Sequence, residues 1–318
     1  MINGMINIYK EAGFTSHDVV AKLRGILKQK KIGHTGTLDP EAVGVLPVCL
    51  GNATKLCELL TDKSKEYEAC LRLGIRTDTQ DLTGTVLEER LVTVTEEKVR
   101  ESMLSFVGDY AQLPPMYSAL KVGGQRLYEL ARQGKEVERT PRAVTIYALR
   151  IQEIELPRIR FTVSCSRGTY IRTLCHDIGE QLGCGGAMES LKRTKVGSFQ
   201  IADALTLTQV EALRDAGGLK ERILSVEDVF AACPKAYVKE QTEKLLKNGN
   251  VLWDRQIGRR EEASCSEGAF EFIQEASDPV SGSLVRMYDA SGSFYGVYEY
   301  REEEKLYRPY KMFLTTEV

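Results

Sequence analysis

The sequence predicts an α+β fold with a large mixed, mostly antiparallel sheet flanked by helices, followed by a small C-terminal β-rich domain. Strand-like alternation and amphipathic helix patterns are interspersed without a regular strand–helix–strand order, which argues against a parallel sheet. After about residue 235, short apolar runs separated by glycine turns replace that mixture. Because 42% of the 318 residues are hydrophobic, a large core is expected. We therefore expect two domains, residues 1–234 and 235–318.

The expected elements of the first domain follow from local signals. Thr15 or Ser16 can cap a first helix, whose basic C-terminal end suits the helix dipole. Alternation over residues 65–75 predicts a strand with one face formed by Tyr67, Ala69, Leu71 and Leu73. Further elements expected in order are a helix near residues 53–60, a helix capped by Thr95, a hairpin at Gly123-Gly124, strands around residues 144–156 and 158–166, and a helix ended by Gly183.

The C-terminal part is less regular. Residues 281–313 predict short strands joined by glycine turns, whereas residues 259–283 are acidic and weakly patterned, as in an insertion. The net charge is +4 over residues 1–200 and −6 over residues 201–318. This asymmetry is compatible with two parts of different function, although ordinary surface charge also explains it.

Several classes of protein are disfavoured. No apolar run approaches the roughly 20 residues that a membrane-spanning helix needs, and the N-terminus lacks the pattern of a secretory signal. The eight cysteines are scattered without a CxxC pair, which disfavours a zinc site and fits a reducing compartment. We therefore expect a cytoplasmic protein that does not contact a membrane.

The glycine loop KIGHTGTLDPEAVGVLPVCLG, residues 31–51, holds one aspartate directly before a proline. Pro40 biases Asp39 toward an extended backbone, and the glycines permit close approach of a ligand. A carboxylate held in this way suits a nucleophile or general base. Three alternatives remain open: a structural turn aspartate, a metal site shared with His34, and a phosphate cradle that lacks the usual spacing.

Two further groups could contribute to a site. In SCSRGTYIRTLCHDIG, Arg172 lies beside Tyr170 near the start of a helix, where its planar guanidinium could pair with a carboxylate or phosphate. Tyr67 shares an apolar strand face, so it is either a core residue or a ring that stacks on a base. An ordinary surface arginine is the alternative for Arg172.

Basic residues gather in two stretches with tyrosines interleaved, a pattern that fits contact with a phosphate backbone. A solvated helix face is the alternative. The first stretch contains Lys121, Arg126, Arg132, Lys135, Arg139 and Arg142 with Tyr117 and Tyr128, and the second contains Lys192, Arg193 and Lys195.

The segment GHTGTLDPEAVGVLPVCLGNATK resembles the signature of the TruB family of bacterial tRNA pseudouridine-55 synthases. Four more segments are similar in order, so the resemblance covers roughly residues 5–230: GFTSHDVVAKLR, KEYEACLRLGIRTDTQDLTG, LPPMYSALKVGGQRLYELARQGKEVER and CSRGTYIRTLCHDIGEQLGCG. It implies a pseudouridine synthase fold, with a PUA-like RNA-binding domain at the C-terminus. The implied activity isomerises uridine 55 in the T-loop of tRNA after base flipping, with no cofactor and no metal.

The resemblance also implies roles for individual residues. Asp39 would be the nucleophile, Arg172 would hold its carboxylate, and Tyr67 would stack on the flipped uracil. The expected substrate and RNA contacts are His34, Lys55, Tyr170, Leu191, Lys10, Lys121, Arg126 and Arg193. We expect a monomer whose partner is the T-arm of tRNA. The rival functions are a noncatalytic module that binds and folds tRNA, and a metal-dependent hydrolase that uses His34 and Asp39.

Overall fold

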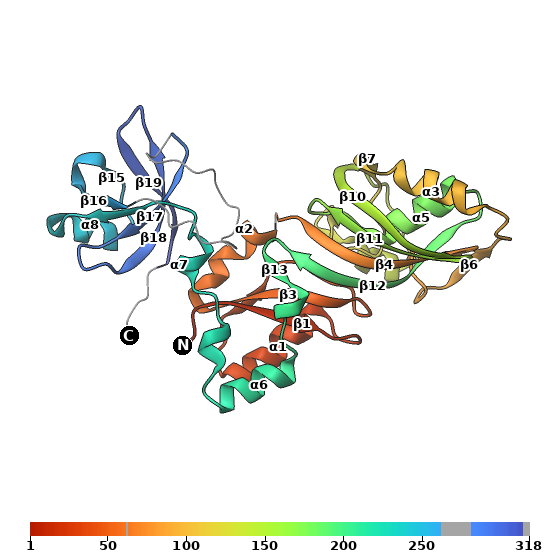
Figure 1. The fold of residues 1–318 in the computed structure, drawn as a ribbon, viewed down its shortest axis with the longest axis horizontal. Coiled ribbons are helices and arrows are strands. Elements are labelled where there is room, and N and C mark those ends of the chain that lie inside the picture. Colours follow the sequence, from red (N-terminus) through yellow and green to blue (C-terminus); the bar gives the residue numbers. More distant parts are fainter. Residues whose placement is uncertain (62, 262–280, 314–318) are drawn as a thin grey trace.

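The computed structural model describes residues 1–61, 63–261 and 281–313 of the chain (Figure 1). Residues 262–280, most of the expected acidic insertion at 259–283, lie outside the described residues. Within the described ranges, no helix has both the length and the apolar character needed to cross a membrane.

A nine-stranded mixed sheet forms the larger part of the molecule. In spatial order its main path contains β1 (Gly4–Lys10), β3 (Val43–Leu50), β12 (Gly186–Val196), β4 (Lys65–Leu73), β11 (Arg158–Cys165), β10 (Arg142–Glu155) and β7 (Gly108–Gln112). Two short strands complete it, β2 (Ile32–His34) on β3 and β13 (Phe199–Gln200) on β12. Every pairing is antiparallel except that of β12 with β3, which confirms the mostly antiparallel sheet.

Helices cover this sheet in two groups, each over its own apolar cluster (Figure 1). The helices α3 (Glu96–Leu104) and α5 (Ile171–Gln181) pack on the β4, β10 and β11 side, and α1 (Ser16–Leu27) and α6 (Leu207–Asp215) pack on the β1 and β3 side. Shorter helices are α2 (Cys57–Thr61), α4 (Leu127–Arg132), α7 (Val226–Val229) and α8 (Glu243–Lys247). Two small hairpins pair β5 (Ile75–Thr77) with β6 (Val86–Glu89) and β8 (Lys121–Val122) with β9 (Gln125–Arg126).

Short segments of 3-10 helix join several of these elements. They are η1 (Gly51–Leu56), η2 (Ile201–Asp203), η3 (Leu219–Arg222), η4 (Glu240–Thr242) and η5 (Asp254–Gln256). The helix expected near residues 53–60 is therefore divided between η1 and α2.

The sequence signals for helix ends act as expected. The Thr15 hydroxyl accepts a hydrogen bond from the Asp18 amide, and the Asp18 carboxylate accepts one from the Thr15 amide, so the two residues form a capping box. Thr95 caps α3 in the same position. Gly183 adopts a φ of 76° just beyond α5, a conformation that favours glycine and ends the helix.

The strand predictions succeed for β4 and fail for β12. The four residues expected on one face of β4 are all buried. The hairpin expected at Gly123-Gly124 is the β8–β9 pair. No strand was expected over residues 186–196, yet β12 occupies the centre of the sheet, between β3 and β4. Two register shifts against β4 interrupt its alternation, and polar residues occupy many of its positions.

A second, six-stranded sheet contains the C-terminal strands. Its spatial order is β15 (Leu252–Trp253), β19 (Leu306–Met312), β18 (Phe294–Arg301), β17 (Leu284–Tyr288), β14 (Lys235–Val238) and β16 (Ile257–Glu261). An apolar cluster joins the two parts, since it contains Met5 and Cys49 of the first sheet together with Phe230, Val297 and Phe313. The expected small β-rich C-terminal part is confirmed.

Candidate active site

Asp39 lies in the loop of residues 35–42, which joins β2 to β3. The Leu38 amide donates to the Ser16 hydroxyl at 2.9 Å, which ties the loop to the start of α1. The Ala42 amide donates to the Asp39 carbonyl at 3.1 Å and closes a turn. The backbone on both sides of the carboxylate is therefore fixed by hydrogen bonds.

Arg172 comes from the first turn of α5 and reaches this loop. Its Nε lies 2.9 Å from Asp39 Oδ2, and its Nη2 donates to Asp39 Oδ1 at 3.2 Å. The contact is a bidentate pair, the strongest form of arginine–carboxylate contact. The Arg172 side chain is only 6% exposed, whereas 38% of the Asp39 side chain is exposed, so the carboxylate remains reachable from solvent.

The rest of the Arg172 guanidinium is also occupied. Its Nη1 donates to the Thr79 carbonyl at 3.1 Å, and its Nη2 donates to the Tyr117 carbonyl at 2.9 Å. A second carboxylate, Asp81, lies 3.7 Å from Nη1. Asp81 was not among the expected site residues, although it belongs to the stretch RTDTQDLTG, in which two carboxylates alternate with threonines. That density of polar side chains was the only sequence signal for it.

Opposing effects set the protonation of Asp39. Burial raises the pKa of its carboxyl group above the ordinary value, and the neighbouring Asp81 adds to that rise. The Arg172 guanidinium lowers the pKa of Asp39 because it favours the charged form. A carboxylate with these neighbours can act as a nucleophile or base, and its reactivity depends on the arginine.

An apolar cluster with an aromatic member includes Leu38, the residue before Asp39. Tyr67 on β4 and Leu191 on β12 are 7% and 9% exposed, and both belong to the cluster that contains Leu38. Burial raises the pKa of the Tyr67 hydroxyl, so this group stays protonated at neutral pH. The surroundings of Asp39 thus combine one charged pair with an apolar wall.

His34 lies at the end of β2, before the loop that carries Asp39. The Gly36 amide donates to its Nδ1 at 3.3 Å, and burial lowers the pKa of the imidazole, which favours the neutral ring. The metal alternative needs further ligands near His34 and Asp39. In the described parts of the chain, no three His, Cys, Asp or Glu side chains converge on a common point.

Tyr170 is the residue that precedes α5. Its amide donates to Gln112 Oε1 at 2.7 Å, and Gln112 Nε2 donates back to its carbonyl at 3.0 Å. The start of the helix that carries Arg172 is therefore anchored to β7. The Tyr170 side chain is half-buried.

The expectation that Lys10 and Arg193 contact the RNA backbone is corrected by their burial. Lys10 is 0% exposed and Arg193 is 1% exposed, so neither cation is available to a phosphate. Lys10 Nζ donates to the carbonyls of Glu11, Phe14 and Pro40 at 3.0, 2.6 and 2.8 Å. Both basic side chains instead hold backbone carbonyls near Asp39.

The remaining expected contacts lie farther out. Lys55 is exposed, and its Nζ donates to the Met312 carbonyl at 2.7 Å, which places it at the junction with the C-terminal sheet. Lys121 and Arg126 face solvent on the β8–β9 hairpin, where Arg126 Nη1 donates to the Tyr128 hydroxyl at 2.9 Å. These two residues are therefore accessible to a large polyanion.

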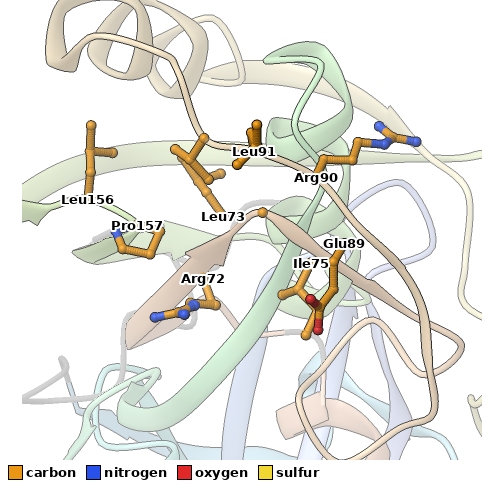
Figure 2. Close-up of a pocket in the computed structure, with 10 residues that line it drawn as sticks. Arg72, Leu73, Ile75, Glu89, Arg90, Leu91, Leu156 and Pro157 are labelled. Carbon is orange, nitrogen blue, oxygen red and sulfur yellow. The ribbon is translucent and has the colours of Figure 1, made fainter.

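A separate cavity of about 380 Å³ opens where β4 ends. Its lining comes from residues 72–75, 89–92 and 156–157, and includes Arg72, Arg90 and Pro157 (Figure 2). None of the expected site residues lines this cavity, so it is distinct from the surroundings of Asp39.

Two family models match the chain. The N-terminal domain of the TruB family of pseudouridylate synthases matches residues 24–171, and the tRNA pseudouridylate synthase B C-terminal domain matches residues 172–231. Among solved structures, an H/ACA ribonucleoprotein bound to a substrate RNA containing 2'-deoxyuridine is similar, with a TM-score of 0.67 and 26% identity. That similarity covers 99% of this chain and 86% of the other chain. Fold and site thus define a pseudouridine synthase.

Curated relatives resolve the class further. A tRNA pseudouridine synthase B of Lachnoclostridium phytofermentans is 54% identical over 98% of this chain and 100% of its own length. One from Clostridium kluyveri is 48% identical over 93% of this chain and 95% of its own length. The chain belongs to the TruB family, and it is an isomerase that forms pseudouridine from uridine in tRNA. The noncatalytic and hydrolytic alternatives are thereby set aside.

Proposed function

We propose that this enzyme isomerises the uridine at position 55 in the T-loop of tRNA, with Asp39 as the nucleophile. In the reaction the bond from ribose C1' to uracil N1 breaks, and a bond from C1' to C5 forms. The proton on C5 is lost, and N1 gains one. The reaction is redox-neutral and transfers no external group, so it consumes no cofactor.

The bidentate contact between Arg172 and Asp39 is the observation that supports this role best. It aims a carboxylate that is still 38% exposed, beside an apolar wall that suits a neutral base. Attack on the sugar, attack on the base and a glycal route all begin from the same ionised aspartate. Asp39 is a nucleophile in the first two routes and a base in the glycal route. The proposal commits to nucleophilic attack and leaves the choice between sugar and base to experiment.

The other side chains would bind the extruded base. Tyr67 would stack on the uracil, Leu191 would form the wall of its site, and His34 would occupy the space that the flipped nucleotides leave. Tyr170 would contact the substrate from the start of α5. Extrusion of a base costs a few kcal/mol. One or two stacking contacts contribute roughly the same free energy and would offset this cost.

The RNA would be held mainly outside this site. Lys121 and Arg126 are exposed on the β8–β9 hairpin and would contact the T-arm backbone. Residues 235–318 would form a PUA-like RNA-binding domain beside the catalytic domain of residues 1–234. We propose a monomeric cytoplasmic enzyme, and Lys55 would stabilise the junction of the two domains through its contact with Met312.

Release of tritium from C5-labelled uridine in tRNA tests this function directly. Wild type should release label from one uridine per tRNA, and a tRNA with cytidine at position 55 should release none. Asp39→Asn should lower the rate by at least ~1,000-fold. Label released from another position would refute the assignment of the target, and an active Asp39→Asn would refute the nucleophile.

A further inference from the structure

Arg193 is the largest fully buried side chain in the described part of the molecule. A buried guanidinium is normally paired with a carboxylate, because an unpaired charge is costly in a protein interior. Within residues 1–61, 63–261 and 281–313, however, no carboxylate lies within ion-pair distance of Arg193. Its positive charge is stabilised by backbone carbonyls, which is an unusual and specific arrangement.

The carbonyls that Arg193 binds lie on both sides of Asp39, two in the loop before it and one in β3 after it. Nη2 donates to the Gly36 carbonyl at 3.2 Å, and Nη1 approaches the Thr37 carbonyl at 3.4 Å. Nε donates to the Val45 carbonyl at 2.7 Å. One planar guanidinium therefore holds the chain both before and after Asp39, with its three nitrogens in a fixed relative geometry.

The same guanidinium also lies beside Tyr67. Tyr67 and Arg193 are direct partners across the antiparallel β4–β12 pair, so both side chains lie on the same face of the sheet. The Arg193 guanidinium is close enough to the Tyr67 hydroxyl to lower its pKa, against the larger effect of burial. Gly44 brings the loop exit against β12, since a Cβ there would lie 2.2 Å from the Arg193 carbonyl oxygen.

We infer that Arg193 is a positioning residue that fixes the distance between the Asp39 loop and the Tyr67 ring. This inference rests on the proposed roles of Asp39 and Tyr67 as nucleophile and stacking platform. Arg193 does not touch the substrate, because its side chain is fully buried. Its loss should impair the chemical step, since misplacement of reacting groups by about 1 Å can cost about 100-fold in rate.

The test compares Arg193→Lys and Arg193→Gln with an exposed control, Arg160→Lys. Arg160 lies on the adjacent part of the sheet and pairs with Glu153 in solvent. Single-turnover rates would be measured with saturating enzyme, and the Kd would be measured for the pseudouridine-containing product tRNA. Both Arg193 variants should react ~10- to 100-fold more slowly, with a Kd within about twofold of wild type. The control should match wild type.

A double-mutant cycle with Tyr67→Phe separates positioning from a general effect on stability. If Arg193 acts through Tyr67, the rate losses of Arg193→Gln and Tyr67→Phe should combine to less than their product. Losses that multiply would overturn the link to Tyr67. A weakened Kd with an unchanged single-turnover rate would overturn the positioning role in favour of RNA binding.

Two further outcomes are decisive. Thermal melts monitor folding. Arg193→Lys leaves a buried charge with fewer hydrogen bonds, so Arg193→Gln, which buries no charge, is included beside it. Failure of both variants to fold would overturn the inference, since Arg193 would then serve the fold as a whole. Asp39→Asn is assayed alongside: activity there refutes the proposed nucleophile, whereas active Arg193 variants beside an inactive Asp39→Asn refute only the positioning role.

Discussion

Arg172 binds both carboxylate oxygens of Asp39, with contacts of 2.9 and 3.2 Å. The arginine comes from a helix and the aspartate from a loop, 133 residues apart in the chain. Because the guanidinium is planar, the pair fixes the plane of the carboxylate as well as its position. The orientation of the Asp39 carboxylate therefore depends on how α5 packs against the sheet.

Replacement of Arg172 by lysine tests the importance of that orientation. Lysine keeps the charge but offers one nitrogen, so the bidentate contact is lost. We expect Arg172→Lys to lower the single-turnover rate by ~100-fold with little change in tRNA affinity. Arg158→Lys is the matched control, because Arg158 binds Glu189 through its guanidinium at an exposed site. Equal rates for Arg172→Lys and wild type would contradict the prediction.

The dependence of the rate on pH should report the ionisation of Asp39. Burial raises its pKa above the ordinary value of 3.8. The proposed nucleophile is the charged form. The rate should therefore fall as the pH decreases through that raised pKa. Arg172→Met removes the main group that lowers the pKa of Asp39. The fall of the rate on the acid side of the pH–rate profile should therefore move to higher pH. Single-turnover rates from about pH 5 to pH 8 would show the shift. A fall that stays at the same pH would contradict it.

Lys10 should stabilise the fold. Lys10→Met leaves three carbonyl acceptors without their donor and should lower the free energy of unfolding by ~1–3 kcal/mol. Urea unfolding measures the loss, and Lys30→Met, at an exposed lysine, should have no effect.

The stabilising effect of Lys10 should also depend on pH. Burial lowers the pKa of Lys10 from 10.5 to about 8, so between these values the unfolded chain binds more protons than the folded one. The contribution of Lys10 to the free energy of unfolding therefore rises with pH across that window. The difference between wild type and Lys10→Met should widen from pH 8 to pH 10.5. A constant difference would contradict the burial of a charged lysine.

The β8–β9 hairpin should contribute to RNA affinity through charge. Neutralising Lys121 and Arg126 together should weaken tRNA binding and reduce the slope of log Kd against log salt concentration by about 1.5. Arg158 and Arg160 are the controls, because both already pair with carboxylates on the protein. Filter binding at several salt concentrations measures the slope. An unchanged slope would remove the hairpin from the interface.

The sequence was most informative where local chemistry determines structure. Helix caps at Thr15 and Thr95, the glycine at the end of α5 and the alternation of β4 each follow from a few adjacent residues. The signature around Asp39 and the later Arg172 motif indicated two partners that the fold then brings together. Their pairing itself depends on tertiary packing and followed only from the resemblance.

The sequence was least informative about β12 and the buried cations. Bulges break the alternation of β12, and its lysines and arginine suggest an exposed segment. Hydropathy places Lys10 and Arg193 on the surface because it ignores carbonyls that a distant loop supplies. Asp81 was missed for the same reason, since its neighbour Arg172 is far away in the chain.

The attachment of the last strand also affects how the protein can be shortened. Directly after β3, the Asn52 side chain donates to the Phe313 carbonyl at 3.0 Å, and the Phe313 side chain is buried in the cluster that joins the two sheets. A chain cut before Lys311 would lose the Phe313 side chain and expose the apolar surface around Phe230. Such a fragment should precipitate on expression, so dissection of the enzyme needs interface substitutions and not simple truncation.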